Sequence, residues 1–75
     1  MKQLTELMRA NAQAQIDRAV VSQERMLTHI VETERANIGD ELKRSLIVSY
    51  EASYQAMQQV IDSNQEILIK TRPEA

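Results

Sequence analysis

The sequence lacks cysteine and has almost none of the residues that form tight turns. Its 75 residues include one glycine, one proline, and no cysteine, phenylalanine or tryptophan. Without cysteine there is no disulfide framework, no thiolate metal site and no cysteine nucleophile. A many-stranded sheet would lack its turns, and a glycine-rich phosphate loop is excluded. The length allows one domain, residues 1–75, with only a marginal core of its own.

Charge of one sign and long apolar runs are also scarce. Nine lysines and arginines are interspersed with eleven acidic residues, for a net charge of −2. No basic tract points to nucleic acid or anionic lipid. No apolar run exceeds three residues, which excludes a membrane span, and the first residues lack the apolar stretch of a signal peptide. We therefore expect a cytoplasmic protein that binds neither membranes nor nucleic acid.

The sequence is rich in helix formers, arranged as two stretches of about thirty residues. Between them, Gly39 suits the left-handed position that ends a helix, and Asp40 suits the N-cap of the next. Pro73 marks the end of the second stretch. These signals predict two helices over about 3–36 and 40–70, a turn at 37–40, and a short disordered tail at 71–75.

Apolar residues recur in both stretches at alternating steps of three and four, the spacing of a coiled-coil seam. The second seam comprises Ile47, Tyr50, Tyr54, Met57, Ile61, Asn64 and Leu68. The first comprises Ile16, Val20, Gln23, Leu27 and Ile30, flanked by Ala12, Ala19 and Met26. These seam residues are the predicted core and dimer contacts.

Two seam residues, Gln23 and Asn64, are polar. A polar seam residue costs stability unless it is paired, but it can fix the register of the helices. Folding at the turn places residue i level with roughly residue 77 − i, so Gln23 meets Ser53 and Tyr54, and Asn64 meets Gln13. The alternative is that both polar side chains reach water at the edges of the stripes.

Both apolar stripes are wider than a contact between two helices requires. Leu46, Ser53, Val60 and Ile67 widen the second one. Domains below about 70–80 residues rarely gain more than a few kcal/mol from their own core, and association is a common remedy. We therefore predict an all-α fold, an antiparallel helical hairpin that dimerises into a four-helix bundle.

The single histidine, His29, is the residue best suited to chemistry near neutral pH. His29 and Glu32 have helical spacing, but they lie near Arg18 and Arg25, away from the apolar stripe, whereas metal pairs in bundles face inward. The arginines interleave with acidic residues, which favours surface pairing over phosphate contacts. We predict no catalytic, cofactor-binding or metal-ligating residue, no cofactor, and no enzymatic activity.

The first turns carry an apolar cluster, Leu4, Leu7 and Met8, rotated away from the main stripe. In the hairpin these residues lie level with the second predicted set, Ile67, Leu68 and Ile69. The six residues either close the open end of the bundle on themselves or form an exposed end that binds a partner helix. They are the candidate partner-binding residues.

Part of the second stretch resembles a known helix. Its residues are Leu46-Ile47-Val48, Ala52-Ser53-Tyr54-Gln55-Ala56, Val60-Ile61-Asp62 and Ile67-Leu68. This pattern loosely resembles the C-terminal helix of flagellar rod and hook proteins, over about a third of the chain. The matching N-terminal motif of that family is absent, and coiled-coil spacing alone generates the pattern, so no residue role is carried over.

The sequence thus predicts a non-enzymatic protein–protein interaction module, such as a small dimeric adaptor, chaperone or inhibitor. It would bind a protein partner by helix-in-groove contacts. One alternative is a structural or assembly subunit that polymerises through coiled-coil surfaces. A DNA-associated regulator is a further alternative, which the charge pattern disfavours.

Overall fold

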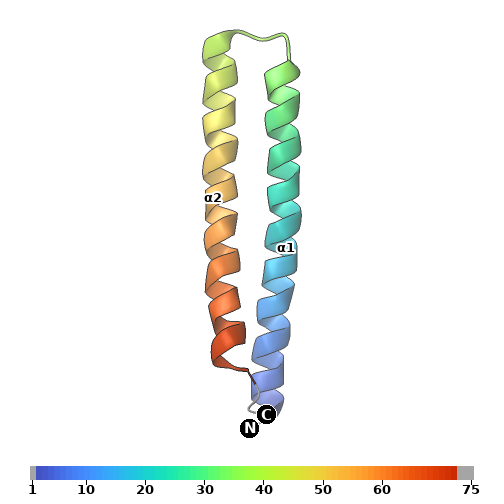
Figure 1. Cartoon of the computed structure of the whole chain (residues 1–75). Coiled ribbons are helices and arrows are strands. Elements are labelled where there is room, and N and C mark those ends of the chain that lie inside the picture. The colour runs from blue at the N-terminus through green and yellow to red at the C-terminus, as the bar shows by residue number, and fades with distance from the viewer. Residues whose placement is uncertain (1, 73–75) are drawn as a thin grey trace.

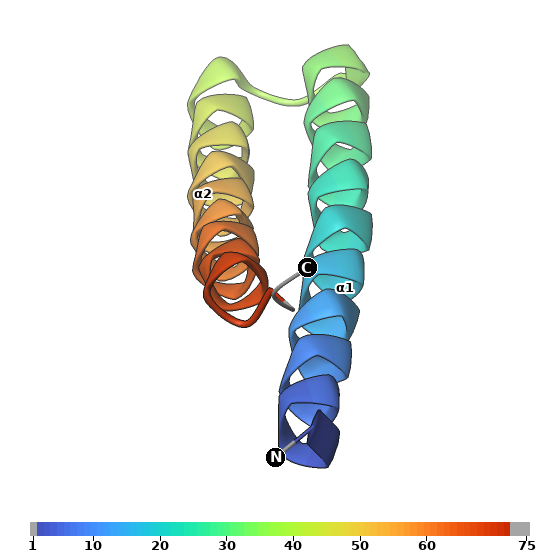
Figure 2. The ribbon, with the colours of Figure 1, turned by 60° about the horizontal axis from the view of Figure 1, so that its bottom comes forward.

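The computed structural model describes residues 2–72, which form an antiparallel hairpin of two long helices (Figure 1). Helix α1 spans Lys2–Arg35 and helix α2 spans Asp40–Lys70. The two helices lie side by side, with the start of α1 near the end of α2 (Figure 2). The predicted hairpin is confirmed, and its helix bounds agree to within a residue.

The connection between the helices differs from the predicted one. Gly39 has φ −59° and ψ 147°, so the prediction of a left-handed glycine is wrong. Gly39 is itself the N-cap of α2, and its carbonyl accepts a hydrogen bond from the Lys43 N–H at 2.9 Å. Asp40, predicted as the cap, is the first helical residue. There its carboxylate interacts favourably with the positive end of the helix dipole. Because the reversal is spread over residues 36–39, no single residue needs a left-handed backbone.

The end of α2 is tied down by hydrogen bonds. The Thr71 N–H donates to the Ile67 carbonyl at 3.0 Å, and the Arg72 N–H donates to the Ile69 carbonyl at 3.3 Å. The tail predicted at 71–75 therefore begins in an ordered cap, and its residues 73–75 lie outside the described residues.

The core follows the line where the helices meet, and it is narrow. Its buried apolar residues are Ala12, Ile16, Ala19 and Ile61, with Met57, Val60 and Leu68 partly buried against them. Two of the four buried residues are alanines, so α1 presents short side chains to α2. The seam predicted for α2 does face α1, since all seven of its residues are buried or half-buried.

The inward face of α1 differs from the predicted seam. Its line of contact with α2 consists of buried or half-buried residues, again at steps of three and four, which are Arg9, Ala12, Ile16, Ala19, Gln23, Met26, Ile30 and Thr33. Thr5, Ala14, Gln15 and Ser22 are also half-buried, off this line. Val20 and Leu27, two of the five residues predicted for the seam, are 40% and 50% exposed. Ile16, Gln23 and Ile30 fit both patterns, and the hairpin uses the face that carries the alanines. Contacts of Val20 and Leu27 with a second copy stay a prediction.

The hairpin is a rod with much exposed surface. It measures 57 × 18 × 14 Å, and its radius of gyration is 17.2 Å, against about 11 Å for a compact chain of this length. Its accessible surface is 6042 Å², whereas a compact monomer of this size exposes about 4,700 Å². About 1,300 Å² of the surface is therefore in excess of what a compact fold would leave exposed. Neither helix, over the described residues, is apolar along enough of its length to cross a bilayer.

Candidate interaction surfaces

Three contacts between the helices fix their register. Arg9 Nη1 donates to the Leu68 carbonyl at 2.6 Å, and Lys43 Nζ donates to the Glu34 carbonyl at 3.1 Å. Gln23 Nε2 lies 3.4 Å from the Tyr54 carbonyl. In each pair the residue numbers add to 77, so the predicted register is confirmed at both ends and in the middle.

Gln23 is the centre of a polar network within the seam. Its side chain is buried, and Nε2 also donates to Gln58 Oε1 at 3.0 Å. Gln58 Nε2 in turn donates to Asp62 Oδ1 at 2.9 Å. The pairing predicted for Asn64 is wrong: Asn64 Nδ2 donates to the Val60 carbonyl of its own helix at 2.8 Å. Its predicted partner, Gln13, is exposed and donates to Asp17 instead.

Arg9 joins the two helices at the open end of the hairpin. Besides the Leu68 carbonyl, its Nη1 lies 3.1 Å from Thr71 Oγ1. Thr71 Oγ1 also donates to the Ile67 carbonyl at 2.7 Å. One guanidinium thus satisfies a carbonyl in the last turn of α2, a group that a helix end otherwise leaves without a partner. No pattern in the sequence predicted this role for Arg9.

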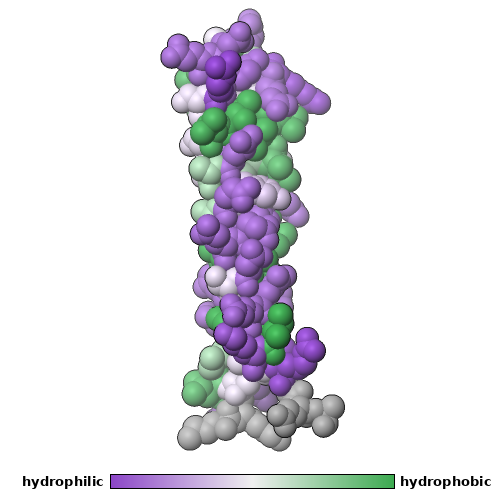
Figure 3. All heavy atoms as spheres, turned by 60° about the vertical axis from the view of Figure 1, so that its left-hand side comes forward, coloured by the Kyte–Doolittle hydropathy of each residue, from purple (hydrophilic) through white to green (hydrophobic). Residues whose placement is uncertain are grey.

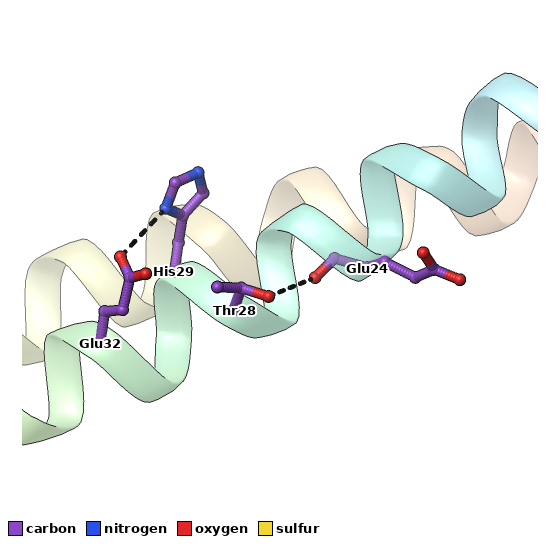
Figure 4. A network of polar contacts seen from close by, with 4 residues as sticks. All are labelled: Glu24, Thr28, His29 and Glu32. Atoms are coloured by element: carbon purple, nitrogen blue, oxygen red, sulfur yellow. Dashed lines mark hydrogen bonds and ion pairs between the residues drawn. The ribbon is translucent and has the colours of Figure 1, made fainter.

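His29 lies on the surface of α1 and stacks on Tyr50 of α2. The ring centroids are 5.2 Å apart and the planes meet at 22°. Its Nδ1 is 3.8 Å from Glu32 Oε2, and the His29 side chain is 47% exposed. Both side chains project from the same side of α1 (Figure 4), where Thr28 Oγ1 also donates to the Glu24 carbonyl. The ring stack could have been found from the register, which brings residues 29 and 50 to nearly the same level.

Among the described residues, no group of three or more histidine, aspartate or glutamate side chains is placed to hold a metal ion. His29 and Glu32 form an i,i+3 pair on the surface of α1, where both side chains are largely exposed.

The six candidate partner-binding residues do not form one closed cluster in the hairpin. Leu4, Leu7, Met8 and Ile69 are 58%, 67%, 45% and 63% exposed. Ile67 and Leu68 are half-buried, and Leu68 packs against the core cluster. The open end of a single hairpin therefore leaves four large apolar side chains in solvent.

A second group of exposed apolar residues lies along the middle of α1 and near the turn. Val20, Val21, Leu27 and Val31 are 40–50% exposed on α1. On α2, Leu42 and Val48 are 55% and 59% exposed. Figure 3, which looks mainly at α2, shows hydrophobic residues between hydrophilic ones, most of them toward the turn. Sequence reasoning treated Val21 and Val48 as isolated and placed Val20 and Leu27 in the seam, so it missed this group.

Comparison of the chain with protein-family models, with curated proteins and with solved structures gave no significant match.

Proposed function

We propose that the hairpin is a non-enzymatic protein–protein interaction module, and that one of its partners is a second copy of itself. The observation that carries the proposal is that the hairpin exposes more large apolar side chains than it buries. Ten large apolar residues are exposed among those the structure describes, whereas the buried apolar core has four members, two of them alanines. Coverage by another molecule is a common reason for a small protein to leave more large apolar side chains exposed than buried.

The area available supports association of two hairpins into a four-helix bundle. Two separate hairpins expose 6042 Å² each, whereas a compact protein of their combined size exposes about 7,800 Å². Association could therefore bury up to about 4,000 Å², within the range of about 2,000–5,000 Å² seen for obligate dimers. The bundle is the predicted architecture that would cover Val20 and Leu27.

The open end is the proposed contact for a different protein. Leu4, Leu7 and Met8 form an apolar face of α1 that an amphipathic partner helix could cover by helix-in-groove binding. Met8 suits such a contact because its flexible thioether adapts to varied surfaces. The absence of enzymatic activity and the cytoplasmic location stay predictions from the sequence.

An assembly subunit is the second candidate. It is favoured by the distribution of the exposed apolar residues, which lie on both helices and toward both ends of the rod. A single pairwise interface covers one part of such a surface, and further copies could cover the rest. A DNA-associated regulator gains no support, since the charges remain interspersed and net acidic.

A double variant, Leu7→Ser with Met8→Ser, tests the role of the open end. Its self-association is measured by sedimentation, and its partners by affinity capture from the native host with mass spectrometry. A partner-binding end predicts unchanged self-association and loss of a protein that the wild type and a Gln59→Ser control both capture. Gln59 is exposed on α2. Weaker self-association with no lost protein would instead assign these residues to the contact between copies.

A further inference from the structure

Two contacts between the helices define two broad sides of the hairpin. On one side, Gln23 of α1 donates to Gln58 of α2. On the other, His29 of α1 stacks on Tyr50 of α2. Residues seven apart in packed helices share a side, and on each side a step of three or four away from the line of contact reaches the outer neighbour, as from Gln23 to Leu27 or from His29 to Arg25. These steps extend each contact along the rod and define what we call the Gln58 side and the His29 side.

The Gln58 side is acidic. Its exposed carboxylates on α1, two or three turns apart, are Glu6, Asp17, Glu24 and Glu34. Those on α2 are Glu41, Glu51 and Asp62. Among residues 3–35 and 40–70, Arg44 is the exposed cation on this side, since Arg9, fourteen residues before Gln23, is half-buried and donates to the Leu68 carbonyl. Exposed apolar residues run between the carboxylates of α1, namely Val20, Leu27 and Val31.

The His29 side has the opposite character. On α1 it carries the exposed cations Arg18 and Arg25, with Glu32 beside His29. On α2 it carries a lane of small or apolar residues, which are Leu46, Ser49, Ser53, Ala56, Val60 and Ser63. This lane is free of charge over four turns, up to Lys70, which pairs with Glu66 at 2.9 Å.

We propose that copies of this chain associate through unlike sides, the Gln58 side of one against the His29 side of the next. Two Gln58 sides would face each other as acidic surfaces, and like charges across an interface disfavour that pairing. With unlike sides, Val20 and Leu27 can pack onto the lane of small residues around Ser53 and Ala56, as ridges fit grooves between helices. The cations Arg18 and Arg25 then lie on the same surface that meets the carboxylates.

Unlike sides have a consequence that a symmetric dimer does not. After two copies join, one Gln58 side and one His29 side remain open, so a third copy can add. Association then continues into a filament or closes into a ring. This inference rests on the proposed self-association and says how the copies meet.

Two charge-reversal variants test the pairing. One is Glu24→Lys with Glu51→Lys, which places two cations at the middle of the Gln58 side; the other is Arg18→Glu with Arg25→Glu, which makes both sides acidic. Each variant alone should associate at least about tenfold more weakly than wild type, by sedimentation at low salt. An equimolar mixture of the two should recover the association, because unlike sides then meet again. Gln59→Lys and Gln59→Glu, away from both sides, are the controls, and helicity is checked by circular dichroism.

The other outcomes overturn the inference in distinguishable ways. If only one of the two variants loses association, or if the mixture of both does not recover it, copies meet through like sides. The proposed function then stands without this pairing. If the wild type remains a folded monomer up to millimolar concentration, the self-association itself fails.

Discussion

Gln23 is a buried residue of the interface between the helices that makes two hydrogen bonds to α2. It is 8% exposed and donates to Gln58 and to the Tyr54 carbonyl. That carbonyl lies within α2. Gln58 Oε1 loses its donor if Gln23 is removed, but the Gln58 side chain is half-buried and can turn this oxygen to water while Nε2 keeps Asp62 as a partner. The network can therefore be replaced by an apolar side chain without leaving a buried polar group unpaired.

The first prediction concerns the Gln23→Leu substitution. It should raise the free energy of unfolding by about 1 kcal/mol, because leucine gains apolar burial and no buried group loses its last partner. Chemical denaturation at one fixed protein concentration measures it. Asn64→Leu is the matched control, since Asn64 bonds within its own helix and its loss should leave the register unchanged. A less stable Gln23→Leu protein would mean that the network contributes more than packing does.

A second prediction concerns Arg9, which is half-buried and holds the last turn of α2. Arg9→Gln should lower the free energy of unfolding by about 1 kcal/mol, because a charge-assisted hydrogen bond is lost. Amide hydrogen exchange should accelerate most at residues 69–72. The control is Arg44→Gln: Arg44 is exposed near the turn and makes no hydrogen bond or ion pair within residues 2–72. Equal acceleration in both variants would contradict the role of Arg9.

At the scale of elements, the helices and the place of the turn could be predicted from composition and from one glycine. The inward face of α1 could not. Ile16 and Gln23 fit either of two faces, and hydrophobicity favours the one with Val20 and Leu27. The hairpin uses the face with Ala12 and Ala19, 1% and 2% exposed, because short side chains admit the larger residues of α2. That choice depends on the fit between two helices, which the pattern along one helix does not contain.

The alanine face supplies a third prediction. Ala19→Leu should lower the free energy of unfolding by about 1–3 kcal/mol, because the added side chain has no room between the helices. Ala10→Leu, at an exposed position of the same helix, should leave it nearly unchanged. Thermal unfolding at a fixed concentration compares the two. A neutral Ala19→Leu protein would indicate that α1 packs through the predicted seam instead.

The backbone conformation of Gly39 was mispredicted, since a glycine between two helices is commonly left-handed and this one has φ −59°. Gly39 caps α2 without a side chain, and nothing lies within 4 Å of a Cβ added there. The candidate sites were predicted only in part. The exposed apolar residues at the open end of the hairpin could be predicted from the sequence, since each lies off the main stripe of its helix. The roles of Arg9 and Tyr50 could not, because they depend on which residues of the two helices lie side by side.

The fourth prediction uses this cap. Gly39→Ser should raise the free energy of unfolding, to a value about 1 kcal/mol above that of Gly39→Ala, because the serine hydroxyl can accept a hydrogen bond from a backbone N–H in the first turn of α2. Urea denaturation of both variants measures the difference. A left-handed Gly39 would instead make both variants less stable than wild type, since a Cβ is strained in that conformation.

At the scale of the whole molecule, the exposed surface is the main reason to propose self-association. The rod exposes about 1,300 Å² more than a compact chain of its size, and ten large apolar residues contribute to it. Its two broad sides differ in charge, which is the basis on which we propose that copies associate through unlike sides. A hairpin that acts alone would leave this surface in water.

Sedimentation equilibrium of the wild-type chain, from micromolar to millimolar concentration, tests this account most directly. We expect a helical species whose mass is that of at least two chains and increases with concentration, because an interaction module that binds its own copies associates by mass action. A folded species with the mass of one chain across the whole range would contradict it.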